Sequence, residues 1–162
     1  MKAKFFTLAT VIVLLAVFCP FAQATNYEDA VKQWHSYEDV AKWMQENFTY
    51  VNINRRMASG VQTPEETFMM KRGYCKDGAT FAIDALNRID PDYDAKMLYI
   101  LSGHYVTLFK MNSKLYIMDF ASGPRFASIR GVHGPFDSIK ELKEYLRKMG
   151  IDSSVYVRGL EE

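Results

Sequence analysis

The order of its periodic segments is the feature that most constrains how this chain can fold. Apolar residues recur at helical spacing in the first half, whereas the second half carries short extended runs. The segment that starts at Ser36 shows the helical spacing on one face: Val40, Trp43, Met44 and Phe48. Helices followed by an antiparallel meander predict an α+β fold, in which the N-terminal helices pack on one side of an antiparallel sheet.

A further helix start is marked at Thr63. Pro64 follows at the first helical position and Glu66 lies three residues after Thr63, which is the pattern of an N-cap with a capping box. We expect this helix to continue to about Lys71 and to stop at Gly73, because glycine interrupts helices.

The next helix is expected to begin at or near Cys75. It carries a stripe of apolar residues suited to burial: Ala79, Phe81, Ala82, Ala85, Leu86 and Ile89. Asp90 and Pro91 would end it, because proline cannot continue a helix.

A β-hairpin is predicted in the second half. Residues 97–101 and 104–111 are expected to form strands, and a turn at 112–114 leads into a third strand over 115–120. The hairpin would bring its two long strands side by side, with their open ends close together.

The C-terminal third is less regular. The segment 121–135 carries three glycines and two prolines, and we expect it to be a long loop. Ser138 then opens a helix that runs through Met149, and 155–157 is expected as a last short strand.

The N-terminus predicts an export signal. Two lysines precede an apolar run over 5–18, and a small-x-small cleavage site ends at Ala24. The run is shorter than the roughly 20 residues that a transmembrane helix needs. We expect residues 1–24 to be a signal peptide, residues 25–162 to form one domain, and the protein to be exported to the periplasm or secreted. An uncleaved membrane anchor is the alternative.

Composition narrows the function. Removing residues 1–24 takes away two lysines and no acidic residue, which changes the formal net charge from +1 to −1. This balance argues against nucleic acid or an anionic membrane as a partner. Removal also takes away Cys19, so Cys75 is the one remaining cysteine and a disulfide scaffold is excluded. A lone thiol of this kind is either buried core or a reactive group.

The residues around Cys75 favour the reactive alternative. A helix N-terminus favours the negative charge of a thiolate, and its backbone N–H groups supply part of an oxyanion hole. His104 opens a strand and is a candidate base. A turn centred on Ser113 would place His104 opposite residue 122 or a neighbour, at the same end of the hairpin as Asp119. A carboxylate in an apolar strand needs a partner, and a histidine N–H is one. Nucleophile, base and orienting acceptor are the components of covalent catalysis.

These motifs resemble the transglutaminase-like cysteine enzyme superfamily, and most closely the exported bacterial transglutaminase-like cysteine proteinases. The resemblance covers roughly residues 38–120 and rests on Thr63-Pro64-Glu65-Glu66, Gly73-x-Cys75-x-Asp77-x-Ala79, His104-x-Val106 and Tyr116-x-x-Asp119. It implies a papain/transglutaminase-like core, with Cys75 as nucleophile, His104 as base and Asp119 as the residue that orients the base. It also implies acyl transfer from an amide, which ends in hydrolysis if water attacks the thioester and in crosslinking if an amine does.

Other residues near the cysteine have two interpretations each. Gln62 is a candidate second oxyanion donor, and a solvated residue before a helix cap is the alternative. Asp77 is expected to act as a first-turn acid of its helix. Members of the proteinase branch often carry acidic residues on both sides of the cysteine and bind calcium there, but Tyr74 and Lys76 occupy these positions here. We therefore predict no calcium, no other metal and no cofactor.

Two arginines of the 121–135 segment, Arg125 and Arg130, are candidates for holding an acidic substrate group, and solvated side chains are the alternative. His35 and His133 have no neighbours at a spacing usable for zinc, so no zinc site is expected.

The sequence therefore predicts an exported cysteine hydrolase, a peptidase or amidase that acts on a protein or peptide substrate through a Cys75 thioester. No stable membrane association is expected once the signal is removed. A protein-glutamine crosslinking transglutaminase or a deamidase is one alternative, because it differs only in the second nucleophile. A catalytically silent transglutaminase-like binding module is the other, and the complete set of Cys75, His104 and Asp119 argues against it.

Overall fold

The computed structural model describes residues 26–52, 60–151 and 154–157. The predicted signal peptide lies outside these residues. The first half contains helices α1 (Tyr27–Gln33), α2 (Tyr37–Asn47), α3 (Pro64–Met70) and α4 (Cys75–Ile89), with the short strands β1 (Thr49–Tyr50) and β2 (Arg72–Gly73). The second half contains β3 (Lys96–Ile100), β4 (His104–Met111), β5 (Lys114–Asp119), β6 (Gly131–Phe136), α5 (Ile139–Lys148) and β7 (Val155–Val157). The 3-10 helices η2 (Pro91–Tyr93) and η3 (Pro124–Ile129) connect elements of the described chain.

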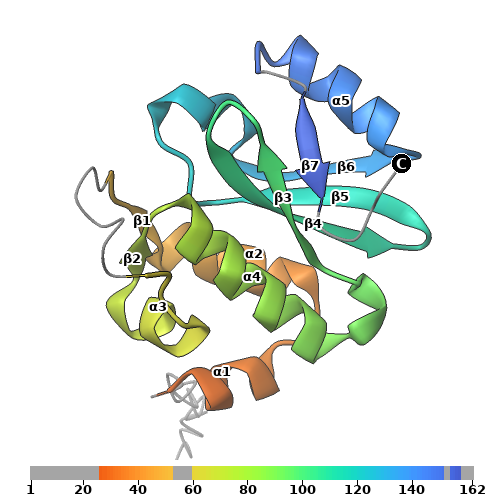
Figure 1. Cartoon of the computed structure of the whole chain (residues 1–162). Helices are drawn as coiled ribbons and strands as arrows, with labels where there is room; N and C mark the ends of the chain where they lie inside the picture. Colours follow the sequence, from red (N-terminus) through yellow and green to blue (C-terminus); the bar gives the residue numbers. More distant parts are fainter. Residues whose placement is uncertain (1–25, 53–59, 152–153, 158–162) are drawn as a thin grey trace, which may run out of the picture.

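One antiparallel sheet organises the second half. Its strand order is β6-β5-β4-β3-β7, so β4 lies at its centre and β6 and β7 form its edges. The helices α1 to α4 gather on one side of this sheet and α5 lies on the other (Figure 1). The predicted α+β class is confirmed, with one addition: the C-terminal helix covers the face that the N-terminal helices leave open.

Two apolar cores fill the spaces between these layers. Because side chains alternate along a strand, neighbouring residues of β4 enter different cores. Phe109 packs with Phe81 and Leu86 of α4, all of them buried. Leu108 packs on the other face with Leu142 and Leu146 of α5. The position of a residue along β4 therefore decides which of the two cores its side chain packs in.

Local signals set the helix boundaries as predicted. The Thr63 hydroxyl accepts a hydrogen bond from the Glu66 backbone N–H at 3.2 Å, and the Glu66 carboxylate accepts one from the Thr63 N–H at 2.8 Å. The helix α3 ends at Met70, just before the predicted end, because Lys71 adopts the left-handed conformation of a C-cap. The helix α4 begins at Cys75 as predicted.

The prediction of a long loop over 121–135 is wrong. Its first half forms η3, and its second half forms strand β6, which pairs with β5. The glycines and Pro135 are tolerated because β6 is an edge strand, whose outer backbone groups need no partner in the sheet. The helix α1 was not predicted, since its seven residues are too few to show a clear period.

A close approach brings α4 against the end of β5. A Cβ atom built on Gly78 would lie 2.4 Å from the Ala121 Cβ, so only glycine lets the helix reach this distance. The Thr107 hydroxyl of β4 donates to the Ala79 carbonyl at 3.2 Å and joins the same turn of α4 to the centre of the sheet. The N-terminal turn of α4 is thus fixed against β4 and β5.

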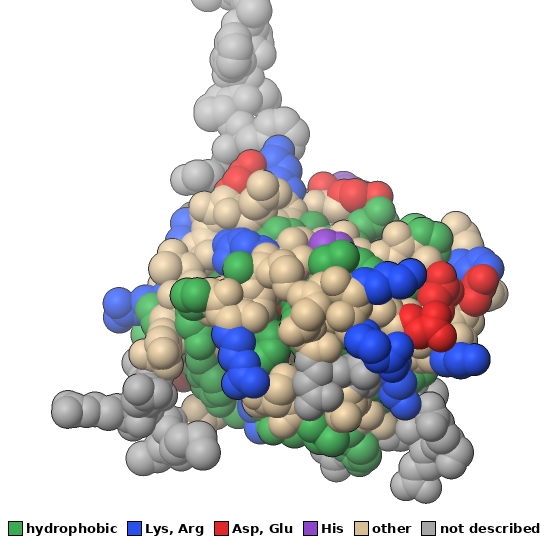
Figure 2. Space-filling model, turned by 90° about the horizontal axis from the view of Figure 1, so that it is seen from above, with side chains coloured by type: hydrophobic (Ala, Val, Ile, Leu, Met, Phe, Trp, Pro, Cys, Tyr) green, Lys and Arg blue, Asp and Glu red, His purple; other side chains and the backbone are tan. Residues whose placement is uncertain are grey.

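The outer surface carries charges of both signs. The face in Figure 2 shows basic side chains in several places and acidic ones among them. Among the described helices, none combines the length and the apolar character needed to cross a bilayer.

Candidate active site

Cys75 is the first residue of α4 and its side chain is partly exposed. The turn before it is held by Asp77, whose buried carboxylate accepts hydrogen bonds from the Tyr74 N–H at 3.1 Å and the Gln62 N–H at 2.8 Å. A Cβ on Gly73 would lie 2.7 Å from the Asp77 Cβ, so this turn needs glycine. Asp77 is the first-turn acid that was predicted, and in addition its two hydrogen bonds hold the turn that leads into Cys75.

A buried hydrogen bond joins the other two predicted residues. His104 Nε2 lies 2.7 Å from Asp119 Oδ2, and the exposed fractions of these two side chains are 2% and 1%. The second carboxylate oxygen, Oδ1, accepts from the Ala121 backbone N–H at 3.0 Å. Both oxygens of Asp119 are satisfied, which fixes the carboxylate and therefore the histidine ring.

The hairpin register explains why the two side chains meet. Thr107 of β4 pairs with Met118 of β5, so one further step places Asp119 opposite Val106. Val106 and His104 are two residues apart and share a face of the sheet, and Asp119 therefore lies diagonally from His104 on that face. The predicted turn was one residue too long: continuing the observed register places His104 opposite Ala121 rather than residue 122.

Cys75 lies beside this pair, close enough for its side chain to contribute to the pKa of His104. Burial lowers the pKa of His104, but the hydrogen bonds with Asp119 and Cys75, and the charges of both, outweigh burial and raise the pKa to about 9. The imidazole is therefore protonated at neutral pH. A protonated ring carries a hydrogen on both nitrogens, and Nε2 donates to Asp119.

Sequence reasoning missed the residues that enclose the histidine. The Phe126 ring of η3 stacks on the His104 ring, with centroids 4.2 Å apart and planes inclined by 11°. Because Phe126 falls in the predicted loop, no periodicity marked it. Ser122 is also buried, and its hydroxyl has no hydrogen-bond partner within the described part of the chain.

Aromatic side chains surround the cysteine as well. Burial raises the pKa of Tyr50, and negative charge on Cys75 and on Asp119 acts in the same direction, which places this phenol close to both groups. Burial also raises the pKa of Tyr74, with contributions from Asp77, Cys75 and Tyr105. On the sheet, Tyr105 contacts Tyr99 with ring centroids 4.7 Å apart. The phenols of Tyr50 and Tyr74 are thus within electrostatic reach of the thiol.

Gln62 lies close to the first turn of α4, but its amide is already engaged. The side-chain oxygen accepts a hydrogen bond from the Thr67 hydroxyl at 3.1 Å, and the backbone N–H donates to Asp77. Its role as an oxyanion donor stays a prediction.

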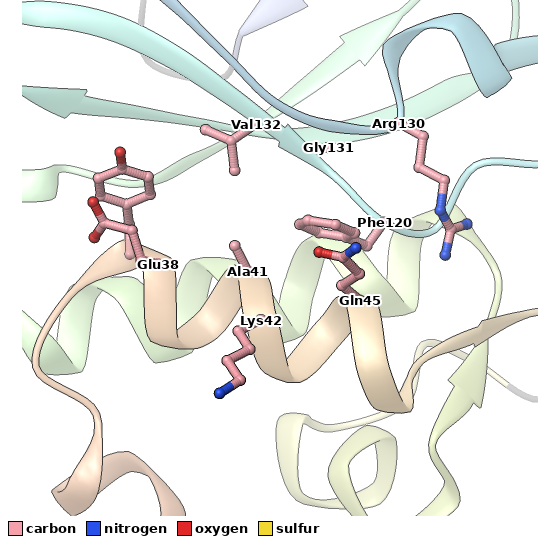
Figure 3. A pocket seen from close by; sticks show the side chains of 9 residues that line it. Glu38, Ala41, Lys42, Gln45, Phe120, Arg130, Gly131 and Val132 are labelled. Carbon is pink, nitrogen blue, oxygen red and sulfur yellow. The ribbon is translucent and has the colours of Figure 1, made fainter.

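Arg130, a predicted candidate for holding an acidic substrate group, lies in a different part of the molecule. Arg130 lines a pocket of about 520 Å³ between α2 and β6, together with Glu38, Lys42 and Gln45 (Figure 3). This pocket contains none of Cys75, His104 and Asp119.

The other two histidines make different contacts. His133 lies 2.8 Å from the Tyr145 hydroxyl, and His35 makes its backbone hydrogen bond to Asp39. Within the described residues, no three His, Cys, Asp or Glu side chains are grouped so that they would hold a metal ion.

The family model described as a transglutaminase-like domain matches residues 24–129, which contain Cys75, His104 and Asp119. The chain therefore belongs to the transglutaminase-like family, a superfamily of mostly cysteine-dependent enzymes. No curated protein sequence matches the chain.

Proposed function

We propose that this protein is a cysteine hydrolase, a peptidase or amidase in which Cys75 is the nucleophile, His104 the acid and base, and Asp119 the residue that orients His104. One observation carries the proposal. The thiol at the first residue of α4 lies beside a buried imidazole and contributes to its raised pKa, and this imidazole hydrogen-bonds to a buried carboxylate at 2.7 Å. Such a chain of three groups activates a nucleophile.

The first half of the reaction uses His104 as an acid. A thiolate beside the imidazolium attacks the carbonyl carbon of the amide, and a carbon–sulfur bond forms. The free backbone N–H groups at the start of α4 stabilise the developing oxyanion. The carbon–nitrogen bond then breaks, the amine leaves with a proton from His104, and a thioester remains on Cys75.

The second half uses the same ring as a base. His104 is neutral after its proton has left, so it accepts a proton from water as the oxygen attacks the thioester. The carbon–sulfur bond breaks, the acid is released, and the thiolate–imidazolium pair is restored. Asp119 keeps the ring in one orientation through both halves and stabilises its positive charge.

Two alternatives use the same residues. If an amine replaces water, the thioester is converted to a new amide and the protein is a crosslinking transglutaminase; a deamidase hydrolyses a glutamine side chain. A silent binding module would keep the fold without this chemistry. The proposal includes export, a protein or peptide substrate, and a single catalytic domain after residue 24.

The test is the pH dependence of Cys75 alkylation by iodoacetamide. It uses protein without residues 1–24, in which Cys75 is the one thiol. We expect fast labelling that persists well below pH 8, and a rate at pH 6.5 that falls by about tenfold or more in His104→Ala, because the imidazolium no longer stabilises the thiolate.

Two matched variants make this result specific. His35→Ala removes an exposed histidine outside the site and should leave the profile unchanged, while Cys75→Ser should abolish labelling. An ordinary thiol profile that His104→Ala does not alter would contradict the proposal. The silent binding module would then be the better explanation. Release of amine from peptide amides, with and without an added primary amine, then separates hydrolysis from amide transfer.

A further inference from the structure

A lysine stands directly beside the nucleophile. Lys76 follows Cys75 in the first turn of α4, and its ammonium lies over the Tyr105 ring, 5.5 Å from the centroid. Tyr105 in turn follows His104 in β4. The contact with the ring holds the ammonium next to the site, where its side chain is partly exposed.

An arginine on another element contacts the ring that stacks on His104. The Arg125 guanidinium of η3 lies over the Phe126 ring, 5.4 Å from the centroid, and Phe126 stacks on His104. Lys76 and Arg125 are far apart in the sequence. The ring under Lys76 belongs to the residue after His104, and the ring under Arg125 stacks on His104.

Neither cation has a carboxylate partner within the described residues. Other basic side chains do: Arg88 pairs with Glu28, Lys110 with Asp94, and Lys114 with Asp137. The carboxylates nearest the site, Asp77 and Asp119, are buried, and their oxygens accept hydrogen bonds from backbone N–H groups and His104. The surface around Cys75 thus presents positive charge that nothing in the described chain pairs.

We propose that the Cys75 site selects acyl donors that carry a negative charge close to the reacting amide, and that Lys76 and Arg125 hold this charge. The substrate class is therefore an acidic peptide or protein segment. This inference rests on the proposed function for the identity of the reacting group. The carboxylate would enter from solvent, where it meets two cations, the partly exposed Lys76 and the exposed Arg125, rather than a single one.

A pair of small probes tests the charge preference without a known substrate. Iodoacetate and iodoacetamide alkylate the same thiol and are close in size, but only iodoacetate is negatively charged. The quantity measured is the ratio of their second-order rate constants at Cys75, at pH 7.5 and low salt. A change in the thiolate fraction alters both rates equally, so the ratio reports only the attraction of the charged probe.

We expect the iodoacetate-to-iodoacetamide ratio to fall by roughly two- to fivefold in Lys76→Met and in Arg125→Met, the size of an exposed ion-pair interaction. It should fall further in the double variant, and high salt should reduce the wild-type ratio. Lys76→Arg keeps the charge and should keep the ratio. Lys140→Met, which removes an exposed lysine of α5, is the matched control for net charge.

The outcomes separate this inference from the proposed function. An unchanged ratio in both Lys76→Met and Arg125→Met, or an equal fall in Lys140→Met, overturns the selection of acidic donors. The iodoacetamide profile and its dependence on His104 test the catalytic pair independently, so the pair can stand while the charge preference fails.

Discussion

The substitution Asp119→Asn tests whether His104 is charged in the folded protein. The site requires two acceptors from residue 119, because the Ala121 N–H and His104 Nε2 each contact one of its oxygens. A carboxamide has one oxygen and one NH₂ group. One of the two donors therefore faces another donor, and the buried ring also loses the negative charge that supports its protonation.

The expected loss of unfolding free energy in Asp119→Asn depends on pH. The folded pKa of His104, about 9, is above the ordinary value of 6.5, so the folded protein binds more protons between these values. The resulting stabilisation is complete below about pH 6.5 and is lost as pH rises through 9. Breaking a buried pair costs about 3 to 5 kcal/mol, so we expect this loss at pH 7. At pH 10 the ring is neutral, so the charge contribution is gone and the loss is at most that of one unsatisfied donor, about 1 to 3 kcal/mol.

Urea unfolding of the wild type and Asp119→Asn at pH 7 and pH 10 measures both values. Asp137→Asn changes an exposed carboxylate that pairs with Lys114, and it should leave the midpoint nearly unchanged at either pH. Equal destabilisation by Asp119→Asn at the two pH values would refute the reasoning, because it would mean that the imidazole is neutral in the folded state.

Two further substitutions test the elements that position the site. Gly78→Ala should destabilise the protein by about 1 to 3 kcal/mol in urea unfolding, since the added methyl group meets Ala121 and outweighs the better helix propensity of alanine; it should also slow Cys75 alkylation, and a higher urea midpoint would contradict the packing. Thr63→Ala should cost about 1 kcal/mol because the N-cap bond to Glu66 is lost. Thr63→Ser keeps the hydroxyl, and an equal loss in this variant would count against the capping bond.

Prediction succeeded where the determining contacts are local. The N-cap at Thr63 and the start of α4 at Cys75 depend on residues within one helical turn, and both were placed correctly. The hairpin also depends on a short turn, so the proximity of His104 and Asp119 was predictable. Its register was not: Asn112 and Ser113 both have positive φ and form a two-residue turn, where a longer one was expected.

The one-residue difference in register matters because side chains alternate along a strand. A register shifted by one would move Asp119 to the other face of the sheet relative to its partner strand, away from His104. His104 and Asp119 do lie together, and the pairing that brings them together is set by the turn and by the cores on both sides of the sheet.

The sequence by itself determines the chemical groups, their order and the helix that presents the thiol. Helix caps, helix-breaking residues and the spacing of apolar residues all act over a few residues. The placement of β6 at the sheet edge, the ring of Phe126 on His104 and the ammonium of Lys76 over the ring of Tyr105 come from tertiary structure. These contacts join segments that are far apart in the chain, and they form only when the sheet brings η3 and α4 to the same end of β4. Periodicity carries no signal for such contacts, since each depends on which distant segment arrives as the partner.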